Sequence, residues 1–179
     1  MTKIVLTFGL ISGVIVAALM WLMLALMNAG VINPDHDGYV WGYATMIIAL
    51  SLVFFGVKSF RDNNGGKISF LKGLQVGILI SLISAVCYAA SWEVYYRTSG
   101  SDFMQQYSQK YIEGMKKNGA SDAEIDKAQT EMAQLMEMYQ NFFVRFGMTL
   151  IEIVPVGIIV ALVSAGLLRK REVLPAQPA

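Results

Sequence analysis

The sequence predicts an all-α membrane protein with four transmembrane helices and a helical hairpin between the third and the fourth. Hydrophobic residues make up 55% of the 179 residues and charged residues only 15%, whereas an ordinary soluble domain is about 25% charged. The apolar residues also gather in four runs long enough to cross the ~30 Å hydrocarbon core of a bilayer as helices. These spans lie at about residues 4–27, 40–57, 73–92 and 146–168.

The first run, residues 4–27, carries no charged side chain. A cleaved signal peptide has an apolar core of only about 7–15 residues, followed by a small-residue cleavage site. This run is longer and no such site follows it, so we expect a retained span. The chain should then form one membrane domain over residues 1–179, since four spans and their connections use up its length.

Aromatic residues mark the expected borders of the other three spans. Trp and Tyr are enriched at both interfaces of a membrane, where their rings act as anchors. The second span begins, the third ends and the fourth begins with such groups: Tyr39, Trp41 and Tyr43; Trp92, Tyr95 and Tyr96; Phe142, Phe143 and Phe146.

A more polar insert at about residues 98–142 separates the third and fourth spans, and its pattern predicts two helices. Asn118-Gly119 is typical of a helix end, and Ser121 followed by Glu124 is typical of a capping box at a helix start. We expect the second helix to run directly into the fourth span. The apolar stripes at helical spacing are Phe103, Tyr107, Tyr111 and Met115 in the first helix, and Ile125, Ala128, Met132, Leu135, Tyr139 and Phe142 in the second.

Each of these amphipathic helices must bury its stripe. The stripes either pack on each other and on the membrane surface, or they bind a partner protein or a second copy of the chain. The candidate partner-binding face is Met132, Leu135 and Tyr139. The many methionines of the insert suit an adaptable surface. They could also hold Cu(I), but no histidine or cysteine accompanies them, so we expect no metal and no cofactor.

Basic residues sort by side of the membrane. Short loops rich in Lys and Arg stay in the cytoplasm, whereas the first connection carries only Asp35 and Asp37 as charged residues apart from His36. We therefore expect a multi-pass protein of the bacterial inner membrane, with both termini and a short tail, residues 169–179, in the cytoplasm. Four of the cations are candidate contacts for anionic lipid headgroups: Lys58, Arg61, Lys67 and Lys72.

Glu152 is the one charged residue within the fourth span, three positions before Pro155. An ionised carboxylate costs about 2.5–3.5 kcal/mol at the bilayer centre and less near an interface. Pro155 also leaves the carbonyl of Ile151 without its usual donor. Two interpretations remain open: a proton- or cation-linked step or ligand contact, or a polar contact between helices near the outer interface. The partners considered for that contact are Asn28, Gln75, Ser81 and Ser84.

Several classes of function are disfavoured. The net charge of +1 argues against a nucleic-acid partner. With His36 as the only histidine, a Ser-His-Asp or Cys-His set is not credible, and the only cysteine, Cys87, cannot form a disulfide within the chain. Asp35-His36-Asp37 lies between Pro34 and Gly38, where a turn is the simpler account than a metal site. Asn63-Asn64-Gly65-Gly66 is also a turn, because it lacks the spacing of a phosphate-binding loop.

Small residues recur every four positions in three of the spans. Such stripes let helix backbones approach closely in lipid, so we interpret them as packing surfaces of a four-helix bundle. They are Gly9, Gly13 and Ala17; Gly73, Gly77 and Ser81; and Gly157, Ala161 and Ala165.

One segment resembles an uncharacterised bacterial family, domain of unknown function 4199. The resemblance rests on residues 55–62 (FGVKSFRD) and 65–70 (GGKISF), followed by Gly73 and Gly77, and it extends over nearly the whole chain. It implies a small four-span protein of the bacterial inner membrane and no particular activity. Together these observations favour a non-enzymatic integral membrane protein, surrounded by the lipid bilayer, that assembles with a partner membrane protein or with itself through the insert. The alternative is a small transporter or channel subunit with a proton- or cation-linked step at Glu152.

Overall fold

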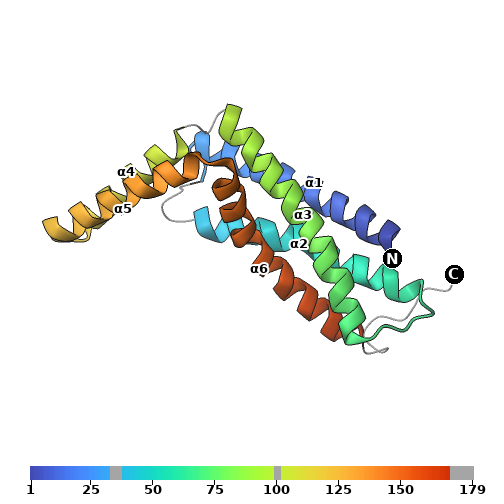
Figure 1. The fold of residues 1–179 in the computed structure, drawn as a ribbon. Coiled ribbons are helices and arrows are strands. Elements are labelled where there is room, and N and C mark those ends of the chain that lie inside the picture. The colour runs from blue at the N-terminus through green and yellow to red at the C-terminus, as the bar shows by residue number, and fades with distance from the viewer. Residues whose placement is uncertain (33–37, 99–101, 170–179) are drawn as a thin grey trace. The chain divides into compact units, whose positions relative to one another are not determined.

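A computed structural model describes residues 1–32, 38–98 and 102–169. Within these ranges the chain forms helices and no strand (Figure 1), which confirms the all-α prediction. The turn predicted at Asp35-His36-Asp37, residues 99–101 of the insert and residues 170–179 of the tail lie outside the described residues. The helices are α1 (Thr2–Asn28), α2 (Gly38–Asp62), α3 (Phe70–Thr98), α4 (Phe103–Lys117), α5 (Asp122–Gln140) and α6 (Phe142–Leu168).

The contacts of the chain divide into two compact units. Met1–Ala89 and Leu150–Ala179 form the first, here called the membrane unit, and Ala90–Thr149 forms the second, the hairpin unit. Helices α3 and α6 contribute residues to both. Each unit is described by itself below.

Helices α1, α2, α3 and α6 are each long and apolar enough to cross a membrane, which agrees with the four predicted spans. In the most apolar stretch of each helix, at most 39% of the residues are buried inside the chain. Val14, Ile48 and Ile159, for example, are more than 60% exposed. An apolar surface of this extent requires lipid or another apolar partner around it.

In the membrane unit, α3 packs against the other three helices through small residues. A Cβ atom added to Gly77 would lie 2.8 Å from the Cβ of Ala161 on α6, and one added to Gly73 would lie 3.3 Å from Ala165. On α1, an added Cβ at Gly9 would meet Ile83 at 2.8 Å, and on α2 one at Gly56 would meet Ile80 at 2.5 Å. The predicted packing role of the small-residue stripes is therefore confirmed.

Serine hydroxyl groups tie the same helices together. Ser12 of α1 donates to the Ala49 carbonyl of α2 at 2.9 Å. Ser84 and Ser81 of α3 donate at 3.2 Å to the carbonyls of Gly9 and Gly157, respectively. In lipid such bonds between helices contribute about 0.6 kcal/mol on average, so close packing holds this bundle more than hydrogen bonding does.

The pairings give the relative directions of the spans. Gly73 faces Ala165 and Gly77 faces Ala161, so α3 and α6 are antiparallel. Gly9 meets Ile83 and Gly13 meets Cys87, so α1 and α3 run in the same direction. The start of α1, the turn between α2 and α3 and the end of α6 therefore lie at one end of the bundle, where the Arg169 guanidinium is 6.0 Å from the Phe70 ring. We call this the cationic end. The predicted turn is present: Gly65 and Gly66 have φ of +66° and +73°.

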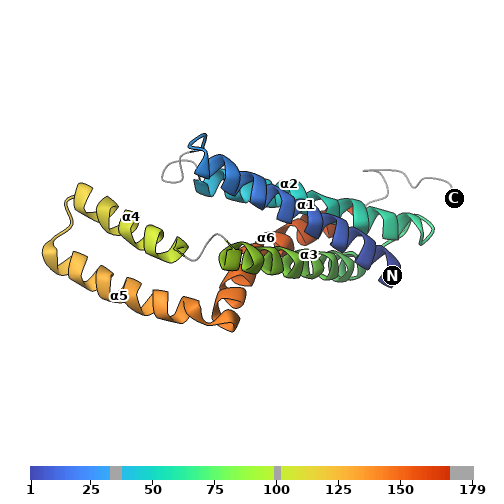
Figure 2. The ribbon, with the colours of Figure 1, turned by 90° about the horizontal axis from the view of Figure 1, so that it is seen from above.

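In the hairpin unit, α4 and α5 lie side by side (Figure 2) around a small core. Ile112, Ile125 and Ala128 are buried there, with Met115 and Ala120 packed against them. The predicted helix end is confirmed, since Gly119 has φ +79° and the Ala120 N–H donates to the Met115 carbonyl at 3.1 Å.

Two details of the hairpin differ from the prediction. In α4, Tyr107 and Tyr111 are 38% and 44% exposed and stack with each other at 6.5 Å instead of entering the core. Helix α5 also does not continue into α6. It ends at Gln140, and Asn141 is extended, with ψ 124°. The Asn141 side chain accepts a hydrogen bond from the Phe143 N–H at 2.9 Å, which caps the start of α6 and explains the break.

The predicted capping box forms at the start of α5. The Glu124 carboxylate accepts hydrogen bonds from the Ser121 hydroxyl at 2.7 Å and from the Ser121 N–H at 2.8 Å. Both bonds favour the ionised carboxylate, the hydroxyl the more strongly, so they hold the pKa of Glu124 below its ordinary value of 4.5.

A lowered pKa makes the first turn of α5 sensitive to acid. The capping contribution should be fully present above the unfolded-state pKa and should be lost as the pH falls through the lower folded-state pKa. We expect the protection factors of the amides in this turn, which compare measured with intrinsic exchange rates at the same pH, to fall below about pH 4. In Glu124→Gln this fall should be absent, whereas Glu137→Gln, far from the turn, should retain it. An identical pH response in both variants would contradict the prediction.

Candidate functional site

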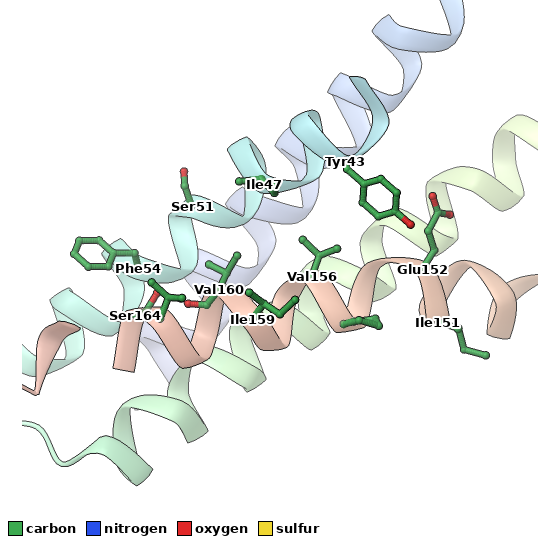
Figure 3. A pocket seen from close by; sticks show the side chains of 12 residues that line it. Tyr43, Ile47, Ser51, Phe54, Ile151, Glu152, Val156, Ile159, Val160 and Ser164 are labelled. Carbon is green, nitrogen blue, oxygen red and sulfur yellow. The ribbon is translucent and has the colours of Figure 1, made fainter. Parts of the chain in front are cut away.

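An open groove on the membrane unit runs between α2 and α6 (Figure 3). Its volume is about 690 Å³, within the ~300–1,000 Å³ range of sites for small ligands. The walls are mainly aliphatic and aromatic, and the only ionisable groups among the lining residues are Glu152 and Tyr43. The residues that line it are Tyr43, Ile47, Ser51, Phe54, Ile151, Glu152, Pro155, Val156, Ile159, Val160, Val163 and Ser164.

Glu152 and Tyr43 lie together at one end of this groove, and their polar groups point toward one another (Figure 3). Glu152 is exposed, and no hydrogen bond or ion pair reaches its carboxylate from the residues that the structure describes. Pro155 lies within α6 and also lines the groove. Because proline has no N–H, the Ile151 carbonyl one turn earlier lacks its helical donor.

The other polar side chains of the groove are satisfied by their own helices. The Ser51 hydroxyl donates to the Ile48 carbonyl and the Ser164 hydroxyl to the Val160 carbonyl, each at 2.6 Å. Ser81 and Ser84, which the sequence offered as partners for Glu152, bond to backbone carbonyls instead. Acceptor groups are thus concentrated at the Glu152 end, so the groove is suited to an amphipathic ligand with a donor or a cation at one end.

A second polar centre lies in the hairpin unit, and reasoning from the sequence missed it. The guanidinium of Arg145 in α6 donates twice to the Glu93 carboxylate of α3, at 2.7 and 2.6 Å. Both residues are buried. A third bond, at 2.7 Å, runs from Arg145 to the Tyr139 carbonyl at the end of α5. Arg97 donates to Glu93 from the other side at 2.7 Å.

Aromatic side chains enclose this ion pair. The Arg145 guanidinium carbon lies 4.0 Å from the centre of the Tyr96 ring, within the range of a cation–π contact. The Trp92 indole donates to the Tyr139 hydroxyl at 2.8 Å. The cluster therefore joins the end of α3, the end of α5 and the start of α6, and its bonds serve structure within the hairpin unit.

One signal in the sequence could have found this pair. Glu93 follows the third apolar run directly, and Arg145 precedes the fourth directly. Opposite charges that flank two spans on the same side of a membrane are placed to meet when those spans are neighbours in a bundle. Because the predicted spans end at Trp92 and begin at Phe146, Glu93 and Arg145 fell in the insert and were not considered as a pair between spans.

The three residues of the candidate partner-binding face differ in how deeply they are buried. Tyr139 is buried and bonded to Trp92, so it serves the hairpin itself. Met132 and Leu135 are half-buried. Met138 is 53% exposed and follows Leu135 by three positions, on the same side of α5.

The four candidate lipid-contacting cations lie at the cationic end of the membrane unit. Lys67 is exposed, and Lys72 donates to Gln75 at 2.9 Å. Lys58 forms an ion pair with Asp62 at 2.7 Å. Arg61 is only 1% exposed and donates to Asp62 at 2.9 Å. Because Arg61 is almost fully buried, it offers almost no surface to a lipid headgroup. Its guanidinium instead holds the Asp62 carboxylate in place.

The fold and these sites define a small multi-pass α-helical membrane protein. The chain belongs to the family described as protein of unknown function (DUF4199), whose model matches residues 7–170. The resemblance seen in the sequence is thereby confirmed. Searches of curated proteins and of solved structures gave no match.

Proposed function

We propose that this chain is a non-enzymatic protein of the bacterial inner membrane that assembles with a partner membrane protein or with a second copy of itself. The hairpin between α3 and α6 would carry this contact. The unequal distribution of Lys and Arg supports an orientation with the cationic end in the cytoplasm and the hairpin outside.

The exposed apolar surface of α5 supports this assignment. The hairpin buries Ile125 and Ala128 in its own core, but it leaves Met132 and Leu135 half-buried and Met138 53% exposed. Methionine adapts to irregular partner surfaces because its side chain is flexible and polarizable. A stripe that is only partly used inside the chain is typical of a binding surface.

Charge placed on this stripe should weaken assembly. We expect Met132→Lys and Leu135→Asp to reduce recovery of the partner or of the dimer about tenfold, since each buries an unpaired charge in an apolar contact. Lys127→Glu, a charge change on the well-exposed side of the same helix, should have little effect. The measurement is affinity purification in mild detergent with mass spectrometry of the recovered chains. Equal recovery in all three variants would refute a binding role for the stripe.

A second candidate function is a transporter or channel subunit with a proton- or cation-linked step at Glu152. The observation that favours it is an exposed carboxylate in a membrane-spanning helix, without a bonded partner among the described residues. Such groups in spans often belong to ion pathways. Four spans rarely form a whole transport pathway, so this function would itself require assembly.

A further inference from the structure

We propose that the groove between α2 and α6 binds a phospholipid with a primary-amine headgroup. The ammonium would lie at Glu152 and one acyl chain would lie along the groove. The inference concerns the membrane unit alone and does not depend on the partner-binding role proposed for the hairpin.

The polar end of the groove has the chemistry that recognises an amine. Glu152 supplies an acceptor that no described residue uses, and the Ile151 carbonyl beside Pro155 supplies a second. The Tyr43 hydroxyl points toward the same place (Figure 3). A primary ammonium has three N–H donors, so it can bond to the carboxylate and still offer a donor to a further acceptor. A quaternary amine has none, and an anionic headgroup would be repelled.

The remaining length of the groove suits an acyl chain. Glu152 and Ser164 mark its extent along α6, which is about 18 Å at ~1.5 Å per residue. One leaflet contributes half of the ~30 Å hydrocarbon core, about 15 Å, and with Glu152 about one turn inside the border about 10 Å of it lies alongside the groove, so the groove is long enough for the chain. The serines of the wall are bonded to their own helices, so the surface offered to the chain is apolar.

The depth of Glu152 also fits a headgroup. A span of about 20 residues counted back from Arg169 at the cationic end reaches about residue 149. Glu152 would then lie only about one turn inside the opposite border. An ionised carboxylate is tolerated more readily there than at the bilayer centre, and a headgroup amine can reach it.

A transmembrane helix suits the polar end of this groove less well. Its backbone N–H groups are bonded within the helix, so only a Lys or Arg side chain could bring a donor to Glu152.

Photo-crosslinking in nanodiscs tests the assignment. The discs contain equal amounts of phosphatidylethanolamine, phosphatidylcholine and phosphatidylglycerol with the same acyl chains. A photo-reactive amino acid replaces Ile159, which lines the groove, or Leu162, which is exposed on α6 outside it. We expect adducts at position 159 to be enriched in phosphatidylethanolamine at least about fivefold over those at position 162, as one charge-assisted hydrogen bond permits.

The carboxylate is tested in the same assay. Glu152→Gln keeps the size of the side chain and removes the charge, so the enrichment at position 159 should disappear. Glu137→Gln, which removes a carboxylate outside the groove, should leave it intact. Equal lipid composition at the two positions in the unsubstituted chain would overturn the proposal without recourse to any Glu152 variant. Enrichment that persists in Glu152→Gln, or a polypeptide adduct at position 159, would overturn it as well. None of these outcomes bears on recovery of a partner through the hairpin.

Discussion

Replacing Arg145 by methionine should destabilise the hairpin unit by about 3 kcal/mol, the largest effect that we expect from any single substitution in this chain. Arg145→Met removes the two hydrogen bonds that the guanidinium donates to the buried Glu93 carboxylate. Loss of one partner from a buried ion pair costs about 3–5 kcal/mol in proteins. The lower end applies because Arg97 still donates to Glu93. Hydrogen exchange of the α4 and α5 amides in nanodiscs measures this opening free energy.

Two companion variants make this test specific. In Glu93→Met combined with Arg145→Met no buried charge is left unpaired, so most of the lost stability should return. Lys127→Met removes one partner of the exposed Lys127–Glu131 pair, whose nitrogen and oxygen are 3.8 Å apart. An exposed pair of this kind contributes about 0.5 kcal/mol or less. If Arg145→Met cost no more than Lys127→Met, the cluster would have no role in holding the hairpin.

Replacing Gly77 by alanine should destabilise the membrane unit by about 1–3 kcal/mol. The new Cβ would lie 2.8 Å from the Ala161 Cβ and 3.1 Å from the Ala161 Cα, so α3 and α6 would have to separate. Overpacking of this kind typically costs about 1–3 kcal/mol, more than the gain of up to about 1 kcal/mol in helix propensity from glycine to alanine. Unfolding by denaturing detergent in mixed micelles measures the change.

Gly166→Ala is the matched control. An added Cβ at Gly166 meets nothing within 4 Å among the described residues, so only the helix-propensity gain remains. The same substitution should therefore have opposite signs at the two positions, destabilising at Gly77 and neutral to stabilising at Gly166. A stabilising Gly77→Ala would mean that α3 and α6 do not approach closely in the folded protein.

The places where prediction from sequence failed have a common cause in the hairpin. Tyr107 and Tyr111 occur at the spacing of a buried stripe, yet the core uses Ile112 on the neighbouring side of α4. Periodicity shows that one face is apolar, but a short helix with apolar residues on two adjacent faces can turn either one inward. The break at Asn141 was also hidden by the apolar pattern. The apolar stripe continues through it from Tyr139 to Phe142, and only its extended backbone separates α5 from α6.

The sequence by itself determined that the chain is a membrane protein, and it determined the four spans, the hairpin with its caps and the small-residue packing stripes. These features follow from composition, run length and spacing, which are local properties of the chain. Only the tertiary structure decided that Glu93 meets Arg145 and that Glu152 and Tyr43 share one groove, because each pair joins helices far apart in the sequence. Which helices become neighbours depends on how the small residues let backbones approach, as Gly77 and Ala161 do, and no single segment carries that information.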